Sequence, residues 1–505
     1  MDRTGDEAGP ITGPARSSAP AWRRSAGSPP RHRSFSVSTS PAPRADDHDD
    51  RTAAPAAGHA RVRGVPGPVA ALRAPLPADP LEALAAVRER TRILVGDLTR
   101  DELERQVDPL MSPLVWDLAH IAAYEDLWLV HRHGDRPLLH PELAALYDAF
   151  ETPRRARGDL ELLDVPQAWA YLDEVRARVH DVVGERGVDP ELFELVLQHE
   201  LQHTETMLQA MRLGGLTEWL DTLPGGARVA ASRAAGTPGE DPADAPVASV
   251  ALVDVPGGPV EVGAADGVFS YDNERPRHGR SIPAFRIATR PVTVALWDAF
   301  VADGGVRDQR FWSDAGWAWR AGGAGSAVHD ATGDGGSATG PPAARAEATP
   351  THDVACHLNL YEAEALAAWA GLRLPTEAEW EHAAASGLLD DVGHVWEWTS
   401  TVFHGYPGFA AHPYKEYSEV FFDREYRVLR GGSFAAHPRV ATPTFRNWDL
   451  PERRQIFSGV RLAADAPGPD DDPVAPAPAP GSSATGGSPV PPPAPAAPTG
   501  REATT

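Results

Sequence analysis

The sequence predicts a protein of the α plus α+β class, in which a four-helix bundle precedes a mixed domain of strands and helices. Two observations predict this order. Apolar residues recur at helical spacing through most of residues 78–222. Residues 248–464 instead show short alternating segments, many turns and many tryptophans. With 505 residues, the chain is long enough for two or three domains.

The first block contains four segments that we expect to be helical, namely Pro80–Leu98, Pro113–His133, Pro166–Gly187 and Pro190–Leu213. Each begins with a proline, which suits the first turn of a helix because its missing N–H would have no partner there. Asp189 and Ser112 directly precede two of these prolines, so we expect them to cap their helices. Four helices in so short a block indicate a four-helix bundle.

The second block alternates between strand and helix signals. Residues 247–263 (VASVALVDVPGGPVEVG) predict a strand, a turn and a second strand. Residues 359–385 predict two short helices, and Arg427–Gly432 and Phe457–Leu462 predict strands. This pattern is typical of an α+β domain with long loops.

The domain boundaries follow from shifts in composition. We expect a disordered extension over 1–75, the bundle over 76–224, a linker over 225–248 and the second domain over 249–464. Within the second domain, residues 321–348 are rich in Gly and Ala and predict a flexible insertion. A Pro/Ala-rich tail over 465–505 is also expected to be disordered.

Composition narrows the class of partners. The net charge of −24 argues against a nucleic acid or an anionic membrane as partner. The single cysteine, Cys356, excludes an internal disulfide and a multi-cysteine zinc site. The sequence shows no run of 18 apolar residues and no signal-peptide pattern, so we expect a soluble cytoplasmic protein without a membrane partner.

Three histidines form the candidate metal site. His199 and His203 lie four residues apart on the predicted inward stripe of the last helix, so both imidazoles can reach one ion. His120 lies on the predicted inward stripe of the second helix. Bundle interiors commonly hold metals, and three neutral imidazoles suit zinc, iron or copper. These residues alone leave the choice of metal open.

The string HELQH also matches H-E-x-x-H, the zinc-peptidase signature. The extended form of that signature needs Gly at 206 and His at 209, where this chain has Thr206 and Gln209. The would-be catalytic base, Glu200, follows His199 directly and therefore points about 100° away from the histidine stripe, a geometry that also occurs in zincins and does not exclude one. The missing third ligand and the presence of His120 argue against a peptidase.

The second block contains strings that resemble a known family. GLRLPTEAEWEHAA, GHVWEWTS, YRVLRGGSF and FSGVRLA resemble the formylglycine-generating-enzyme (sulfatase-modifying-factor) domain, which has a C-type-lectin-like fold. Formylglycine-generating enzymes need a cysteine pair for copper, and this chain has Cys356 alone, so that activity is not expected. The helical block resembles the DinB-like bundle.

The two blocks together resemble the ergothioneine-biosynthesis sulfoxide synthases, also called hercynine oxygenases. The strings that carry this resemblance are MSPLVWDLAHIAAYEDLWL, HELQHTETML, SYDNERPRH and PTFRNWDLPERRQIFSGVRLA. The resemblance implies an Fe²⁺ and O₂ enzyme that joins the sulfur of γ-glutamylcysteine, or of cysteine, to hercynine and forms a sulfoxide. It further implies iron ligation by His120, His199 and His203, the last two within an HxxxHxE motif that ends at Glu205.

The same resemblance implies the substrate contacts. Gln202 and Asn447 are expected to meet hercynine, next to Trp448, and Asp449 and Arg453 are expected to hold the amino and carboxylate groups of the thiol substrate.

Arginines from the bundle are implied as further contacts to the thiol substrate. Arg154, Arg155 and Arg157 are the candidates, and the sequence does not decide among them. A tyrosine that donates a proton or a hydrogen atom is also implied. Among Tyr406, Tyr414 and Tyr417, the spacing favours Tyr414 first and Tyr417 second.

Two departures from the family pattern stand out. Only nine residues, 386–394, separate two strings that are usually further apart, and the 321–348 insertion replaces sequence that is usually better ordered. Neither includes a candidate ligand or substrate residue. The alternative function is a zinc-dependent DinB-type hydrolase or thiol transferase with a lectin-like binding module.

Overall fold

The computed structural model describes residues 74–217, 250–322, 347–348 and 353–467, all of which lie in one compact unit, Gly64–Thr505. The predicted linker, nearly all of the predicted N-terminal extension, most of the predicted insertion and all but the start of the predicted tail lie outside these residues. The predicted α plus α+β class is confirmed.

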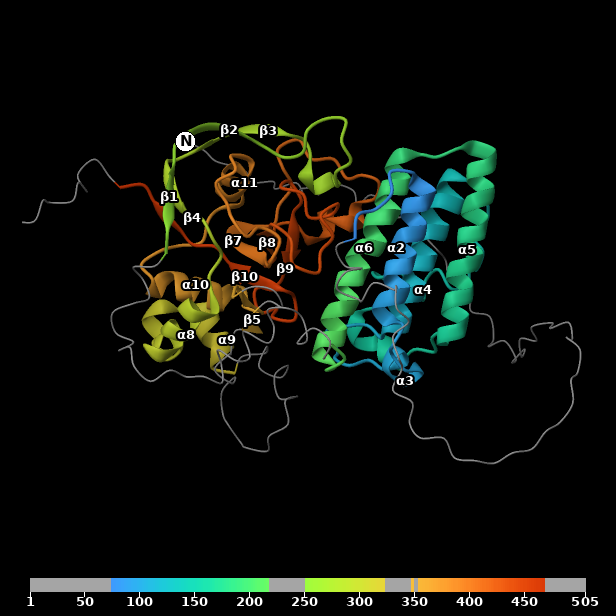
Figure 1. Cartoon of the computed structure of the whole chain (residues 1–505), viewed down its shortest axis with the longest axis horizontal. Helices are drawn as coiled ribbons and strands as arrows, with labels where there is room; N and C mark the ends of the chain where they lie inside the picture. Colours follow the sequence, from blue (N-terminus) through green and yellow to red (C-terminus); the bar gives the residue numbers. More distant parts are fainter. Residues whose placement is uncertain (1–73, 218–249, 323–346, 349–352, 468–505) are drawn as a thin grey trace, which may run out of the picture. The chain divides into compact units, whose positions relative to one another are not determined.

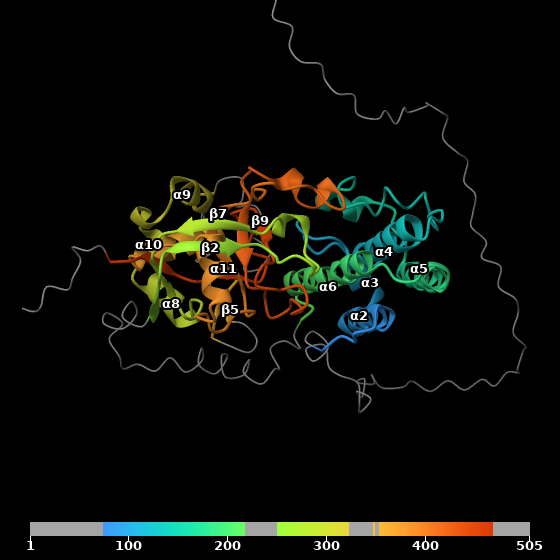
Figure 2. The same ribbon diagram turned by 90° about the horizontal axis from the view of Figure 1, so that it is seen from above.

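The described part of the bundle contains four long helices, which are α2 (Pro80–Val95), α4 (Leu114–Glu125), α5 (Val165–Arg186) and α6 (Pro190–Leu213). Figures 1 and 2 show these helices gathered side by side, with α2 against α6 and α4 against both α5 and α6. A π-helical segment, η1 (Asp126–His133), continues α4, and a short α3 (Arg100–Glu104) joins α2 to α4. The four predicted helices are therefore confirmed.

The helix caps confirm one prediction and correct another. The Asp189 carboxylate accepts hydrogen bonds from the backbone N–H groups of Glu191 and Leu192, as expected of an N-cap. Ser112 does not cap α4, because Pro113 occupies the cap position without a side-chain bond. The Ser112 hydroxyl instead accepts a hydrogen bond of 2.6 Å from Nη1 of Arg157.

Buried charges, rather than histidines, fill the centre of the bundle. Arg88 donates to Glu125 and Glu200, and Arg176 donates to Glu125 through two bonds. Both carboxylates are fully buried. The prediction that the histidine stripe of α6 faces the bundle interior is thus wrong in part. His199, Gln202 and His203 of that stripe are only partly buried, and Gln202 bonds Tyr271 of the second domain.

The described strands of the second domain form four small sheets. The central one has the order β10 (Ser458–Val460), β7 (Trp396–Val402), β8 (Arg427–Arg430) and β9 (Asn447–Asp449). A second has the order β1 (Leu252–Val255), β4 (Phe285–Ala288) and β11 (Ala463–Asp465). The other two pair β2 (Gly258–Val262) with β3 (His278–Ile282) and β5 (Glu347–Ala348) with β6 (Ala355–Cys356). Helices α8 (Val294–Ala302), α9 (Asp314–Arg320), α10 (Leu360–Trp369) and α11 (Glu377–Ala385) complete the domain.

The predicted strand–turn–strand over 247–263 is confirmed as two strands, although these strands do not pair with each other. β1 pairs with β4, and β2 pairs with β3. The chain leaves one sheet and joins another at Gly257 and Gly258. Gly258 has φ 142°, which favours glycine, and a Cβ on Gly257 would come within 2.4 Å of the backbone nitrogen of Ala284. The two helices predicted over 359–385 and both later strands are confirmed.

Three buried arginines tie the central sheet to its surroundings. Arg446 bonds Glu377 at the start of α11, and Arg461 bonds Glu397 on β7. Arg430 on β8 bonds Glu381 of α11. Such pairs are costly to break, because removing one partner leaves a buried charge alone.

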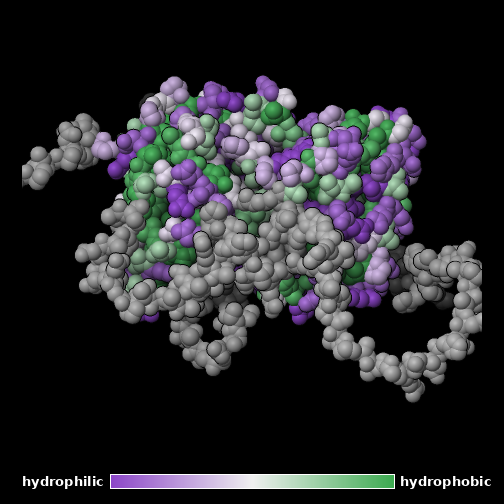
Figure 3. Space-filling model, viewed as in Figure 1, coloured by the Kyte–Doolittle hydropathy of each residue, from purple (hydrophilic) through white to green (hydrophobic). Residues whose placement is uncertain are grey.

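The outer surface is mixed in polarity. Figure 3 shows hydrophilic and hydrophobic residues interspersed over the face in view. Across the described ranges, no helix combines the length and the apolar character needed to span a membrane.

Candidate metal centre and substrate site

Three histidines from two helices meet at one point. His120 comes from α4, and His199 and His203 come from α6, and one ring nitrogen from each lies within 4.8 Å of the other two. The Nε2 atoms of His120 and His199 are 3.1 Å apart. The structure therefore brings together the three residues that the sequence pattern singled out.

In His120 and His203, the Nδ1 atom has a partner outside the cluster, so the Nε2 atom is available to bind a metal. Nδ1 of His120 lies 2.6 Å from the carbonyl oxygen of Tyr147, and Nδ1 of His203 lies 3.1 Å from Oδ1 of Asp117. An Nδ1–H that donates to a carbonyl or carboxylate leaves the lone pair on Nε2, which is the usual arrangement around a metal-bound histidine. Asp117 Oδ2 is buried with no hydrogen-bond partner in the described structure.

Burial keeps two of these imidazoles neutral. Burial, followed by the nearby His203, lowers the pKa of His120 and of His199 well below the ordinary value. Neutral imidazole is the form that binds a metal. Two lone pairs that close together repel each other unless they share a cation, so the donor set fits a divalent metal held by nitrogen. No carboxylate belongs to the group, so coordination positions remain for substrates.

Glu200 lies on the opposite side of α6. Its carboxylate accepts bonds from Arg88 at 2.9 and 3.2 Å and from the Thr91 hydroxyl at 2.8 Å. Because these partners hold it in the bundle core, it cannot act as a base at the histidine cluster. The structure thus supports the argument against a zinc peptidase.

Glu205, the last residue of the HxxxHxE motif, also points away from the cluster. Its Oε1 accepts hydrogen bonds from the Trp396 indole at 2.8 Å and from the Ser433 hydroxyl at 2.6 Å. Both donors belong to the second domain.

Aromatic residues cover one side of the histidines. Tyr124, one turn after His120 on α4, stacks on His199 with ring centroids 3.6 Å apart. Its hydroxyl lies 3.3 Å from that of Tyr414, and Tyr414 stacks on Trp128. Tyr414 therefore lies beside the cluster through Tyr124, a residue outside the set predicted from the sequence.

Gln202 lies next to a second tyrosine pair. Its amide donates a 2.7 Å hydrogen bond to the Tyr271 hydroxyl, and the Tyr271 ring stacks on Tyr417 at 4.3 Å. Tyr271 belongs to the SYDNERPRH string, but no role for it was inferred from the sequence. Tyr406 lies elsewhere, because its ring packs on Arg446 and His278 in a separate cluster.

The predicted substrate segment forms β9. Trp448 stacks on Phe403 with centroids 4.3 Å apart and meets Tyr417 edge-on. The Asp449 and Arg453 side chains form an ion pair at 3.6 Å, and Nε and Nη1 of Arg453 are buried without a hydrogen-bond partner in the described structure. Asn447 pairs with Leu429 of β8 in the sheet register.

The three candidate bundle arginines lie together on η2 (Arg154–Asp159) but differ in environment. Arg154 and Arg155 are exposed, and the Arg154 charge acts on both His120 and Asp449. Arg157 is buried, donates to Ser112 and two backbone carbonyls, and lies 3.4 Å above the Trp116 ring, which stacks on His120. Arg157 thus borders the cluster through Trp116.

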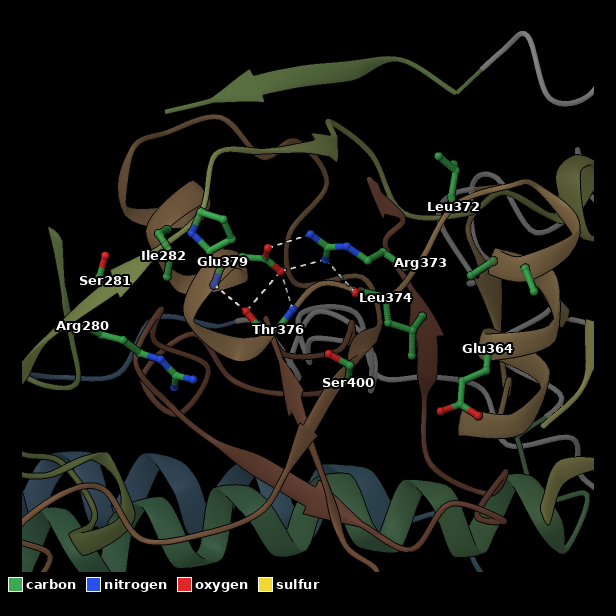
Figure 4. A pocket seen from close by; sticks show the side chains of 13 residues that line it. Arg280, Ser281, Ile282, Glu364, Leu372, Arg373, Leu374, Thr376, Glu379 and Ser400 are labelled. Atoms are coloured by element: carbon green, nitrogen blue, oxygen red, sulfur yellow. Dashed lines mark hydrogen bonds and ion pairs between the residues drawn. The ribbon is translucent and has the colours of Figure 1, made fainter. Parts of the chain in front are cut away.

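A cavity of about 510 Å³ lies apart from this site, in the second domain (Figure 4). Its lining includes Arg280, Glu364, Arg373 and Glu379, and no residue of the histidine cluster. Arg373 and Glu379 neutralise each other through bonds of 2.9 and 2.8 Å.

Fold and site together define a protein with a candidate three-histidine metal centre on a helical bundle that is joined to an α+β domain. Residues 83–207 match the family model of the DinB superfamily. Residues 238–391 and 385–466 match the sulfatase-modifying factor enzyme 1-like domain in two stretches.

Full-length relatives then identify the family. The hercynine oxygenase of Mycolicibacterium smegmatis is 42% identical over 442 residues, which covers 76% of this chain and 98% of the relative. That of Mycobacterium tuberculosis is 41% identical over 431 residues, covering 76% of this chain and 97% of the relative. The formylglycine-generating enzyme of Streptomyces coelicolor is 39% identical over 168 residues, covering 31% of this chain and 52% of the relative. This chain belongs to the hercynine oxygenase family, and it is an oxygenase of ergothioneine biosynthesis.

Proposed function

We propose that this enzyme uses Fe²⁺ and O₂ to join the sulfur of γ-glutamylcysteine to the imidazole of hercynine, giving γ-glutamyl-hercynylcysteine sulfoxide. The reaction balances. Replacing the S–H and the imidazole C–H by a C–S bond removes two electrons, and adding oxygen to sulfur removes two more. One molecule of O₂ accepts all four, and its second oxygen leaves as water. The observation that carries the proposal is the three-histidine cluster, with Gln202 on the same helix as two of the histidines and with Tyr414 reached through Tyr124. Tyr417 in turn contacts both Tyr414 and Trp448 of β9.

His120, His199 and His203 would hold the iron. Three histidine ligands would leave positions on Fe²⁺ for O₂ and for substrate donors, and the ion would supply the redox chemistry. The protein adds a fixed ligand geometry, through the bonds from His120 to the Tyr147 carbonyl and from His203 to Asp117. Metals that lack redox chemistry, zinc among them, would occupy the same nitrogens without supporting the reaction.

Hercynine would bind between Gln202 and β9. The Gln202 amide donates to Tyr271, so its carbonyl oxygen is available to accept a hydrogen bond from the hercynine imidazole N–H. Asn447 would meet the hercynine carboxylate. The trimethylammonium group carries a diffuse positive charge, which aromatic faces such as that of Trp448 attract.

The thiol substrate would bind at the other end of β9. Asp449 would receive its ammonium group, and Arg453, whose Nε and Nη1 lack hydrogen-bond partners, would receive a carboxylate. The charge of Arg154 acts on Asp449, so Arg154 can meet a second carboxylate in the same region. Two arginines favour γ-glutamylcysteine, which has two carboxylates, over cysteine, which has one.

Tyr414 would supply a proton or hydrogen atom from its hydroxyl. Burial, as the largest effect, raises the pKa of Tyr414, so its phenol stays protonated at neutral pH. Tyr124 holds the hydroxyl at 3.3 Å. Tyr417 lies beside Gln202 and would contact the imidazole instead.

The test is a product assay. Protein loaded with Fe²⁺ without oxygen is mixed with hercynine and either γ-glutamylcysteine or cysteine, then exposed to O₂, and the sulfoxide is detected by mass spectrometry. We expect product with γ-glutamylcysteine in the iron form and none in the zinc form. Absence of a sulfoxide with both thiols would overturn the proposal.

A further inference from the structure

The HxxxHxE motif ends at Glu205, whose carboxylate is not part of the three-histidine cluster. Glu205 lies two residues after the proposed ligand His203 on α6, and it is 7% exposed. It reaches into the second domain, where Trp396 on β7 and Ser433 after β8 both donate to its Oε1, at 2.8 and 2.6 Å. A buried carboxylate with two donors from another domain is a joint between the domains.

The donor side of this joint is rigid. Gly431 and Gly432 have φ of 94° and 82°, so they turn the chain sharply after β8 and deliver Ser433. A Cβ on Gly432 would come within 2.3 Å of the Ala441 Cβ, so glycine is required there. The Ser433 hydroxyl oxygen also accepts from the backbone N–H groups of Ala435 and Ala436, both at 3.2 Å. Its remaining hydroxyl proton is thereby aimed at Glu205.

A second contact from a neighbouring helix reaches the same turn. Arg90 on α2 donates to the Thr204 hydroxyl of α6 at 3.1 Å and to the Ala435 carbonyl at 3.0 Å. Its positive charge also acts on Glu205, which offsets part of the cost of burying that carboxylate. The segment Ser433–Ala435 is thus bonded to two helices of the bundle at once.

Glu205 and its two donors connect the three-histidine cluster to strand β9 through few intervening residues. On one side, Glu205 is half a helical turn from His203. On the other side, β7 pairs with β8, and β8 pairs with β9, which carries Asn447 and Asp449. β7 and β9 are two strand spacings apart, about 10 Å, and Trp396 lies two residues along β7 from Trp398, whose partner Leu429 pairs with Asn447.

We propose that Glu205 is a positioning residue that sets the distance between the three-histidine centre on the bundle and the substrate strand β9 on the second domain. The inference rests on the proposed function. Each half of the site is built within its own domain, and their alignment depends on contacts such as this one. A misplacement of about 1 Å between bound reactants can cost 10²-fold in rate.

The variants separate positioning from folding. Glu205→Leu removes both hydrogen bonds, and Glu205→Gln keeps an Oε1 that can accept both. Trp396→Phe removes the indole donor alone and keeps an aromatic ring. Val182→Ala, which truncates a fully buried side chain on α5, provides a loss of stability away from the joint. Metal content and thermal unfolding are measured for every variant.

Two readouts are needed, one of which does not depend on turnover. The first is kcat and KM of the iron enzyme with hercynine and γ-glutamylcysteine. The second uses cobalt(II)-loaded protein titrated with γ-glutamylcysteine, in which a sulfur-to-metal charge-transfer band appears when the thiol held by β9 reaches the metal.

We expect Glu205→Leu to bind one metal, to lose about 10- to 100-fold in kcat and to lose most of the charge-transfer band. Glu205→Gln should stay within about threefold of wild type, Trp396→Phe should lie between the two, and Val182→Ala should keep both signals. A folded, metal-loaded Glu205→Leu with unchanged kcat and band would overturn the role of Glu205, as would a loss of metal in parallel with activity. A metal-loaded wild type with neither band nor product would instead contradict the proposed function.

Discussion

Glu200 Oε1 lies 2.9 Å from Nε of Arg88 in the bundle core, although the neighbouring residue His199 belongs to the three-histidine cluster. Residues of the HELQH string therefore lie on different sides of the helix and have two different roles. Its histidines belong to the three-histidine cluster, and its glutamate neutralises a buried arginine.

Glu200→Gln tests this division. We expect a loss of about 3–5 kcal/mol in the free energy of unfolding, because Arg88 keeps a buried charge with one partner fewer. The metal-loaded folded enzyme should keep its kcat within about twofold. Thermal unfolding and single-turnover rates would measure both quantities, with exposed Glu89→Gln as the control. A large loss of kcat at unchanged stability would show that Glu200 takes part in the chemistry.

Asp117→Asn tests the support of His203. The carboxylate bonds Nδ1 of His203 at 3.1 Å, and loss of such a partner usually lowers metal affinity by about 10- to 100-fold. Competition with a chelator would measure the affinity, and exposed Asp97→Asn should behave as wild type. An unchanged affinity would mean that Asp117 does not orient the ring.

Tyr271→Phe tests the orientation of Gln202. Without the Tyr271 hydroxyl, the Gln202 amide loses its 2.7 Å hydrogen bond and is held less firmly, so we expect KM for hercynine to rise by up to about tenfold with a smaller change in kcat. KM for the thiol should not change. Tyr171→Phe, on α5, is the matched control. Equal effects on both substrates would contradict a specific contact with hercynine.

Arg154→Ala tests the choice of thiol. Loss of one charged contact should raise KM for γ-glutamylcysteine by about 10- to 100-fold while leaving the weaker reaction with cysteine nearly unchanged. Steady-state assays with both thiols measure the ratio, and exposed Arg105→Ala serves as the reference. A parallel change for both thiols would place the second carboxylate elsewhere.

Glu125→Gln tests the pH dependence of stability. Burial alone would raise the pKa of Glu125, but Arg176 and Arg88 outweigh it and hold the pKa below 4.5. A depressed carboxyl pKa stabilises the fold above the unfolded pKa, and this contribution disappears as the pH falls through the folded value. The free energy of unfolding, measured with urea from pH 7 to pH 3, should therefore fall less steeply below about pH 4.5 in the variant than in wild type. The same dependence of unfolding free energy on pH in both proteins would contradict a lowered pKa of Glu125.

Local signals in the sequence were sufficient for the secondary structure that carries the site. The proline-initiated segments became α2, α4, α5 and α6, and the i, i+4 spacing correctly placed His199 and His203 on one face. These features depend on residues close together in the chain, where spacing alone fixes geometry. The same reasoning could have found Tyr124, which follows His120 by four residues on the same helix.

Other features depended on contacts between residues far apart in the chain. Periodicity shows that a helix face is apolar or polar but not which partner covers it, so the prediction that the whole histidine stripe faces the bundle interior is only partly correct. Ser112 has the residue type of a cap, yet Arg157, 45 residues away, uses its hydroxyl.

By itself, the sequence determined the class, the helices and the residues able to bind a metal, because these follow from local spacing and side-chain chemistry. Only the tertiary structure decided what Glu200, Glu205 and Tyr271 do. Each is a polar group whose hydrogen-bond partner comes from another helix or another domain, and burial makes that partner necessary. The partner, rather than the residue type, sets the role.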